Sequence, residues 1–118
     1  MHKYHSGQLR ERGTVDALGY ESAGGGSKTE VWSPLRIDVP LDIHPMTQSE
    51  IRFAQRIEHP VTHGVVARYD TVYKPDIVRI RWYDRSGIYH VLRLRSVIDV
   101  DARGRWLEML AEEIRLAD

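Results

Sequence analysis

The stretch DIVRIRWYDRSGIYHVLRLRSVIDV, residues 76–100, decides the fold class. Apolar and polar side chains alternate in its first part, which is the pattern of a strand with one buried face. The apolar members are Val78, Ile80 and Trp82, and the polar members are Arg79, Arg81 and Tyr83. The tetrapeptide DRSG predicts a tight hairpin turn, because Gly87 takes a positive φ at no steric cost. The alternation then resumes, so residues 76–100 predict two antiparallel strands.

Strand patterns continue on both sides of this hairpin. Residues 61–70 predict a strand, and residues 9–16 alternate weakly and suggest a first strand. Residues 31–44 predict a half-buried strand. Its alternating positions are Leu35, Ile37 and Val39 against Arg36 and Asp38. We expect the core to draw on each part of the pattern: Trp32, Ile37, Val66, Ile80, Trp82, Leu94 and Leu107.

Two segments have helical features. A capping box that runs from Thr47 to Glu50 opens a short predicted helix over residues 48–57, which Pro60 ends. Residues 105–118 allow two interpretations from the residues alone. Their strong helix formers favour a helix by propensity, but their apolar and polar side chains also alternate as in a strand.

The composition restricts the classes of function. The chain has 118 residues, which suit a single domain, and its 42% apolar content is that of an ordinary soluble domain. Its 17 basic residues balance 17 acidic ones, so a globally basic nucleic-acid binder is not expected. The arginines between Arg79 and Arg105 form a local basic stripe, which we interpret as solvated strand faces. No apolar run approaches the roughly 20 residues of a membrane span, so no membrane partner is expected.

Motifs that would carry catalysis or ligand binding fail on their spacing. In GGGSKT, residues 24–29, a serine separates the glycines from the lysine, and a strand pattern follows where a phosphate-binding loop needs a helix. In DVDARG, residues 99–104, Arg103 takes the place of a calcium ligand. The chain has no cysteine, and His44 and His90 have no metal-binding partner nearby in the sequence. We therefore predict no catalytic residue, no metal site, no cofactor and no enzymatic activity.

Two segments lie outside the strand patterns. Residues 1–8 form a polar arm, and residues 17–30 predict an extended glycine-rich loop. Gly24, Gly25 and Gly26 fix no backbone conformation, and each costs more ordering entropy than another residue would. Such a loop is either an idle linker or a mobile element with a function.

Several short motifs follow one another in a fixed order along the chain. The first is Gly-x-Leu-x-x-Arg at Gly7, Leu9 and Arg12, and a glycine-containing loop and Trp32 come next. The matching positions further on are Glu50, Ala54, Thr62, His63, Arg68 and Tyr69. A long strand, a turn with Asp and Arg, and a strand that ends in Glu complete the series over residues 89–113. In this order the chain resembles the phage head–tail joining proteins, also called head closure or stopper proteins.

The resemblance implies a mainly β fold, namely a small antiparallel β-barrel with one short α-helix and a long glycine-rich loop. It also implies a strand rather than a helix over about residues 105–113. Family members form a ring around the channel for double-stranded DNA, and about twelve copies are expected here. The ring joins a portal or adaptor protein above to a tail or tail-terminator protein below. It would lie in the neck of a phage, or of a phage-derived gene transfer particle, assembled in the bacterial host cytoplasm.

The resemblance also gives expected roles to residues. In the family, the loop between the first strands projects toward the channel. Residues 17–30 occupy the matching place, and the residues expected to line or close the channel are Ser22, Ala23, Gly24, Gly25, Gly26, Ser27 and Lys28. Contacts with neighbouring subunits or proteins are expected from His2, Lys3, Tyr4, His5, Leu9 and Arg12. We expect the arm, residues 1–8, to become ordered only against such a neighbour.

Two other functions remain open at this stage. The chain is also compatible with a tail-completion or terminator protein of the same particle. A different class is a small barrel that binds single-stranded nucleic acid, which would need a basic groove with exposed aromatic rings. The candidate residues for that groove are Trp82, Tyr83, Tyr89 and Arg81. The position of Trp82 on the apolar side of its strand favours core packing instead.

Overall fold

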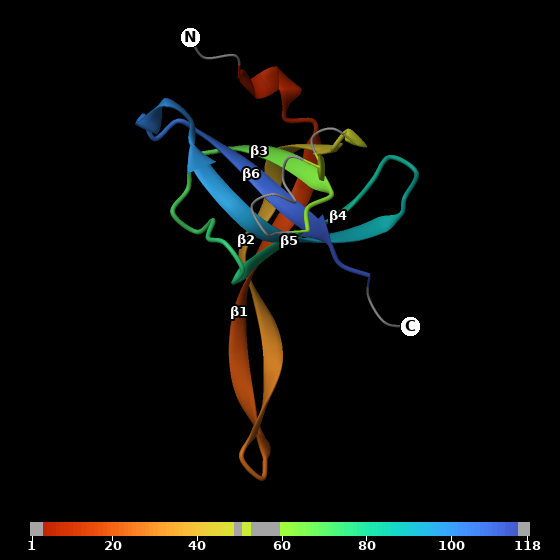
Figure 1. Ribbon diagram of the computed structural model, residues 1–118, viewed down its shortest axis with the longest axis vertical. Helices are drawn as coiled ribbons and strands as arrows, with labels where there is room; N and C mark the ends of the chain where they lie inside the picture. The colour runs from red at the N-terminus through yellow and green to blue at the C-terminus, as the bar shows by residue number, and fades with distance from the viewer. Residues whose placement is uncertain (1–3, 49–50, 53–59, 116–118) are drawn as a thin grey trace.

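A computed structural model describes residues 4–48, 51–52 and 60–115, and it shows a small antiparallel β-barrel (Figure 1). Its strands are β1 (Glu11–Gly24), β2 (Ser27–Pro45), β3 (His63–Arg68), β4 (Val78–Tyr83), β5 (Tyr89–Asp99) and β6 (Trp106–Glu113). Two 3₁₀ turns, η1 (Ser6–Gln8) and η2 (Val100–Ala102), precede β1 and β6. The strands close in the order β1-β2-β3-β6-β5-β4, and every neighbouring pair is antiparallel. The predicted mainly β fold is confirmed.

The hairpin that decided the fold class forms as predicted. Residues of β4 pair with β5 from Arg79 opposite Arg93 to Tyr83 opposite Tyr89. Gly87 has a φ of 82° in the turn between them, which confirms its predicted conformation. The C-terminal segment is also a strand, because β6 pairs with both β3 and β5. In this segment, pairing with two neighbouring strands and burial of the alternating apolar side chains outweigh the intrinsic helix propensity.

The core fills the inside of the barrel with alternate side chains of every strand. The described residues buried there include Val15, Leu41, Val65, Ile80, Leu92, Leu94, Leu107 and Met109. Of the predicted core residues, Val66, Ile80, Trp82, Leu94 and Leu107 are buried. The prediction was wrong for Ile37, whose side chain is 75% exposed, and for Trp32, which is only partly buried.

A β-bulge in β2 explains the exposure of Ile37. Gly13 of β1 pairs with Val39, but Val15 pairs with Arg36, so two residues of β2 lie opposite the single residue Thr14. Asp38 has a φ of 56° at this point. Because an extra residue reverses the alternation of a strand, the side chains before the bulge turn away from the core.

The N-terminal segment packs on the outer surface of the barrel. Leu9 is buried with Val66 and Trp106, and Tyr4 packs against this cluster. The hydroxyl of Tyr4 donates a hydrogen bond to Glu108 of β6. Residues 4–8 thus have contacts within the chain itself, through the Tyr4 ring that covers Trp106, although the sequence predicts that residues 1–8 become ordered only against a neighbour.

The predicted helix over residues 48–57 falls largely outside the described residues. Gln48, Ile51 and Arg52 have helical backbone. The amide of Ile51 donates to the carbonyl of Thr47 at 2.9 Å, as in the first turn of a helix.

Candidate functional site

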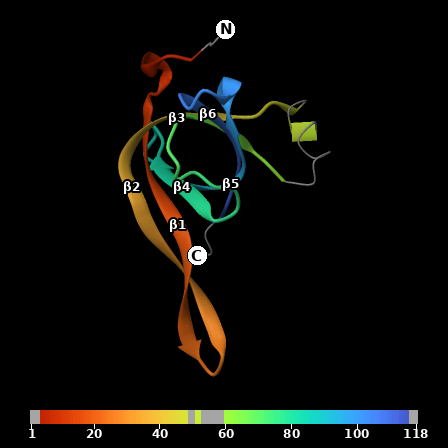
Figure 2. The same cartoon turned by 90° about the vertical axis from the view of Figure 1, so that its left-hand side faces the viewer.

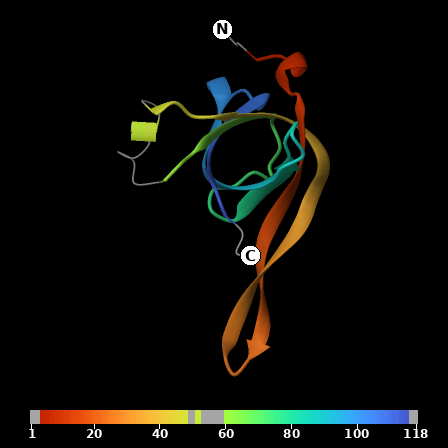
Figure 3. The same cartoon turned by 90° about the vertical axis from the view of Figure 1, so that its right-hand side faces the viewer.

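The predicted loop over residues 17–30 is instead a two-stranded ribbon, which corrects the sequence interpretation. Pairing of β1 with β4 ends at Ala17 opposite Val78, but pairing with β2 continues to Gly24 opposite Ser27. In all three ribbon views this part of β1 and β2 leaves the barrel as one arm (Figures 1, 2 and 3). The radius of gyration is accordingly 15.0 Å, against about 13.5 Å for a compact chain of this length.

The glycines form the tip of the ribbon. Gly24, Gly25 and Gly26 have φ values of 86°, 59° and 83°, a region that other residues rarely adopt. A Cβ atom at any of the three would meet nothing within 4 Å. The turn conformation, and not close packing, therefore requires glycine here. The hydroxyl of Ser27 donates to the carbonyl of Gly24 at 2.8 Å and closes the turn.

An aromatic side chain fixes the ribbon at its base. Trp32 lies opposite Leu18 in the first pair beyond Ala17 and Ser33. The guanidinium carbon of Arg79 lies 4.6 Å from the centre of the Trp32 ring, and that of Arg93 lies 5.6 Å from it. Each arrangement is a cation–π contact, which favours one fixed position of the ring. The base of the ribbon is thus held by side chains of β4 and β5 in addition to the backbone hydrogen bonds between β1 and β2.

A buried carboxylate adds a second attachment at the same place. Asp16 is 1% exposed, and its Oδ2 accepts hydrogen bonds at 2.8 Å from the Nε atoms of both Arg79 and Arg81. The hydrogen bond to Asp16 raises the pKa of Arg81. Arg95 is paired in a similar way, with Asp76 and Glu112. The predicted basic stripe is therefore partly neutralised by carboxylates of the chain itself.

The residues expected to contact neighbours have different roles. His2 and Lys3 lie outside the described residues. Leu9 is buried within the chain and Tyr4 lies against Trp106, and the expected contact of these two side chains with a neighbour stays a prediction. His5 and Arg12 are exposed on the surface. The N-terminal segment lies at the end of the molecule opposite the ribbon tip (Figure 1).

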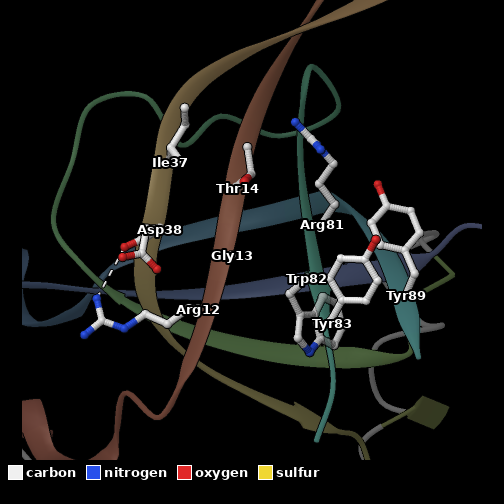
Figure 4. A pocket seen from close by; sticks show the side chains of 9 residues that line it. All are labelled: Arg12, Gly13, Thr14, Ile37, Asp38, Arg81, Trp82, Tyr83 and Tyr89. Carbon is white, nitrogen blue, oxygen red and sulfur yellow. Dashed lines mark hydrogen bonds between the residues drawn. The ribbon is translucent and has the colours of Figure 1, made fainter. Parts of the chain in front are cut away.

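A cleft on the outside of the barrel brings together all four residues of the nucleic-acid hypothesis (Figure 4). The rings of Tyr83 and Tyr89 lie 5.1 Å apart at its rim, and Tyr83 is 67% exposed. Trp82 also borders the cleft but is buried, and its ring stacks on His90 at 4.8 Å. Core packing of Trp82 is thus confirmed, and its face is not available to a base.

The cleft carries little uncompensated charge. Arg81 is bound to Asp16, and the cleft is lined by both Arg12 and the acidic Asp38, to whose backbone carbonyl Arg12 donates at 3.3 Å, as Figure 4 shows. Ile37 lies beside them because of the bulge in β2. Alternation alone could not predict this grouping, since a bulge depends on the register of a strand against its partner. The cleft suits an apolar or aromatic surface better than a phosphate chain.

Two histidines lie beside carboxylates of the chain. His44 lies 3.8 Å from the carboxylate of Asp42, and His90 lies between Asp84 and Glu113. Within the described part of the chain, no group of three or more histidine or acidic side chains could hold a metal ion. No helix among the described residues is long and apolar enough to cross a membrane.

Comparisons with known proteins support the fold alone. No family model matches the chain, and no curated protein matches it. The chain is similar to the solution structure of protein SF1141 from Shigella flexneri 2a, with a TM-score of 0.70 and 22% identity. The match covers 93% of this chain and 96% of that one. At this identity the likeness extends to the arrangement of strands and not to function.

Proposed function

We propose that the chain is a structural subunit of the neck that joins head to tail in a tailed phage or phage-like gene transfer particle. Twelve or so copies form a ring between the portal or adaptor protein and the tail. The proposal begins from the ordered motifs in the sequence. The observation that supports it most is the ribbon. The family resemblance implies a projecting element between the first two strands, and the β1–β2 ribbon projects at that position.

The dimensions of the ribbon suit a part that reaches into a channel. About eight residues of β1 extend from Ala17 to the tip, and at about 3.3 Å per residue they span about 25 Å. In a ring of subunits, each copy would direct one such arm toward the channel. Small residues at the tip, Ser22 to Ser27, let many copies converge on one axis without steric overlap.

The charge of the tip also suits passage of DNA. Among residues 22–28 the single charged side chain is that of Lys28. Since each cation that neutralises a phosphate strengthens nonspecific binding, a tip with many cations would hold DNA in the channel. A nearly neutral tip narrows the passage without retaining the duplex by charge.

Gene replacement in the producing strain tests the proposal. Loss of the gene should leave tailless heads that package DNA but do not retain it, and the wild-type gene should restore tailed particles. A variant without Gly24–Ser27 should assemble the ring but retain less DNA in tailless heads, measured as nuclease-resistant DNA per head. Arg103→Ala, in the exposed turn before β6, serves as the matched control. Normal numbers of tailed particles without the gene would refute the neck assignment.

A tail-completion role in the same particle would give a different defect, namely tails of abnormal length or structure on heads that keep their DNA. The exposed pair Tyr83 and Tyr89 favours, as a second candidate, a module that binds single-stranded nucleic acid. Fluorescence anisotropy with a labelled oligothymidylate tests it. Binding that weakens in the double variant Tyr83→Ser, Tyr89→Ser would support that function instead of the neck.

A further inference from the structure

One histidine joins two segments that are far apart in the sequence. The Nδ1 atom of His90 lies 2.5 Å from Oε2 of Glu113, at the end of β6. Its Nε2 atom lies 2.7 Å from Oδ2 of Asp84, in the turn between β4 and β5. The imidazole also stacks on Trp82 with ring centres 4.8 Å apart, so its orientation is fixed from a third side.

Both contacts need a proton on the imidazole. An ionised carboxylate only accepts hydrogen bonds, so each ring nitrogen must donate, and only the doubly protonated imidazolium has two N–H groups. A neutral imidazole would direct the lone pair of one nitrogen at a carboxylate and lose that contact. We propose that His90 is a pH-sensitive clasp, which ties the β4–β5 turn to the end of β6 when protonated and releases one of them when neutral.

The turn and the strand end have few other attachments to each other. Asp84 uses Oδ1 to accept from the amides of Ser86 and Ile88 at 2.8 and 3.0 Å, which folds the turn on itself and leaves Oδ2 for His90. The strand end is held elsewhere by the amide of Glu113, which donates to the hydroxyl of Thr62 at 2.8 Å, and by the amide of Ile114, which donates to the carbonyl of Val91 at 2.9 Å. Release of the clasp therefore loosens the attachment while the turn keeps its own hydrogen bonds.

The charged groups around the clasp favour the protonated state. Hydrogen bonds to Glu113 and then to Asp84 raise the pKa of His90 above its usual value of 6.5. From β3, His63 also faces this end of the barrel, and burial lowers its pKa, so it loses its proton at a lower pH than His90 does. From β1, Glu11 lies 3.9 Å from Arg85 of the turn.

The pH window follows from these directions. A histidine with a raised pKa in the folded state contributes its full stabilisation below the unfolded pKa of about 6.5 and loses it as the pH rises through the folded value. The hydrogen bond from His90 lowers the pKa of Asp84 below its usual value of 3.8, so acid does not readily break that contact. As the pH rises above 6.5 and through the raised pKa of His90, the clasp opens at the rim that carries Tyr83 and Tyr89.

Nuclear magnetic resonance on the full chain tests the clasp. The ring nitrogens of ¹⁵N-labelled His90 should titrate above pH 6.5. Over the same pH range, protection of the Ile114 amide against hydrogen exchange, corrected for the intrinsic rate, should fall roughly threefold or more. Protection of core amides such as Ile80 should not follow this titration.

Two charge-removing variants and a control make the test specific. Glu113→Gln and Asp84→Asn keep the side-chain shape, and Asp84→Asn keeps the acceptor for the turn amides; both should lower the pKa of His90 and flatten the pH dependence at Ile114. His44→Gln, at a histidine outside this cluster, should leave both unchanged. A His90 titration at or below 6.5, or Ile114 protection that ignores this titration, would overturn the proposal.

Discussion

Replacement of Asp16 by asparagine should weaken the attachment of the ribbon to the barrel. The substitution keeps the shape of the side chain and removes the charge that Arg79 and Arg81 share at 2.8 Å each. A hydrogen bond to a charged partner contributes about 1.5–3 kcal/mol when the pair is buried. Two such bonds would give about 3–6 kcal/mol if both arginines were fully buried.

The arginines are only partly buried, so the expected cost is smaller. Their side chains are 22% and 33% exposed and can turn toward water when the carboxylate is lost. The amide oxygen of the new asparagine can also accept from one of them. We therefore expect Asp16→Asn to lower the free energy of unfolding by about 2 kcal/mol, and Asp16→Ala by about 3 kcal/mol. For a chain of this size, about 2 kcal/mol corresponds to a fall in melting temperature of roughly 8 °C.

Urea denaturation followed by tryptophan fluorescence measures the change. The denaturant slope should stay the same, so that the shift of the midpoint reports stability. A double-mutant cycle of Asp16→Asn with Arg79→Met should give a coupling energy of about 1 kcal/mol or more. Glu21→Gln, on the exposed face of the ribbon, is the control and should stay within about 0.5 kcal/mol of wild type. A change for Asp16→Asn as small as that of the control would refute the reasoning.

Three further changes separate packing from function. Trp82→Ala should cost about 3–5 kcal/mol, because it removes a buried ring and leaves a cavity; a cost under about 1 kcal/mol in a thermal melt would show that the ring is exposed. Deletion of Gly24–Ser27 removes the turn and leaves Ala23 alone between the paired residues Ser22 and Lys28, so a new turn must form at the exposed tip, at a cost of about 1 kcal/mol in the free energy of unfolding; a loss above about 2 kcal/mol would contradict this. Tyr4→Ala should cost about 1–2 kcal/mol through its contact with Trp106, whereas an unchanged melting temperature would mean that the arm is not packed.

The predictions that succeeded depended on patterns that one strand carries by itself. Alternation in residues 78–83 and the glycine at Gly87 specify a strand and its turn without reference to distant residues. The segment from Arg105 onward could not be assigned from its own residues, because helix propensity favoured a helix and alternation favoured a strand. The family resemblance favoured the strand, and pairing on both sides by β3 and β5 explains why that choice was right.

The failures have a common physical cause, which is pairing with a distant strand. Residues 17–30 look like a loop because polar and glycine residues break the alternation, yet hydrogen bonds across the ribbon hold them extended. Ile37 looks like a core residue because a bulge is set by the register against β1. Tyr4 has its partner, Glu108, on β6, far away in the sequence. His90 has one partner at the end of β6 and another, Asp84, in a turn that only the fold orients toward it.

A cryo-EM reconstruction of the neck of the particle tests the central claim most directly. The account predicts a ring of copies of this chain below the portal or adaptor protein, with each β1–β2 ribbon directed toward the channel axis and Gly24–Gly26 at its inner limit. A neck that contains no copy of the chain would contradict the account. So would a ring in which the ribbons point outward, away from the DNA.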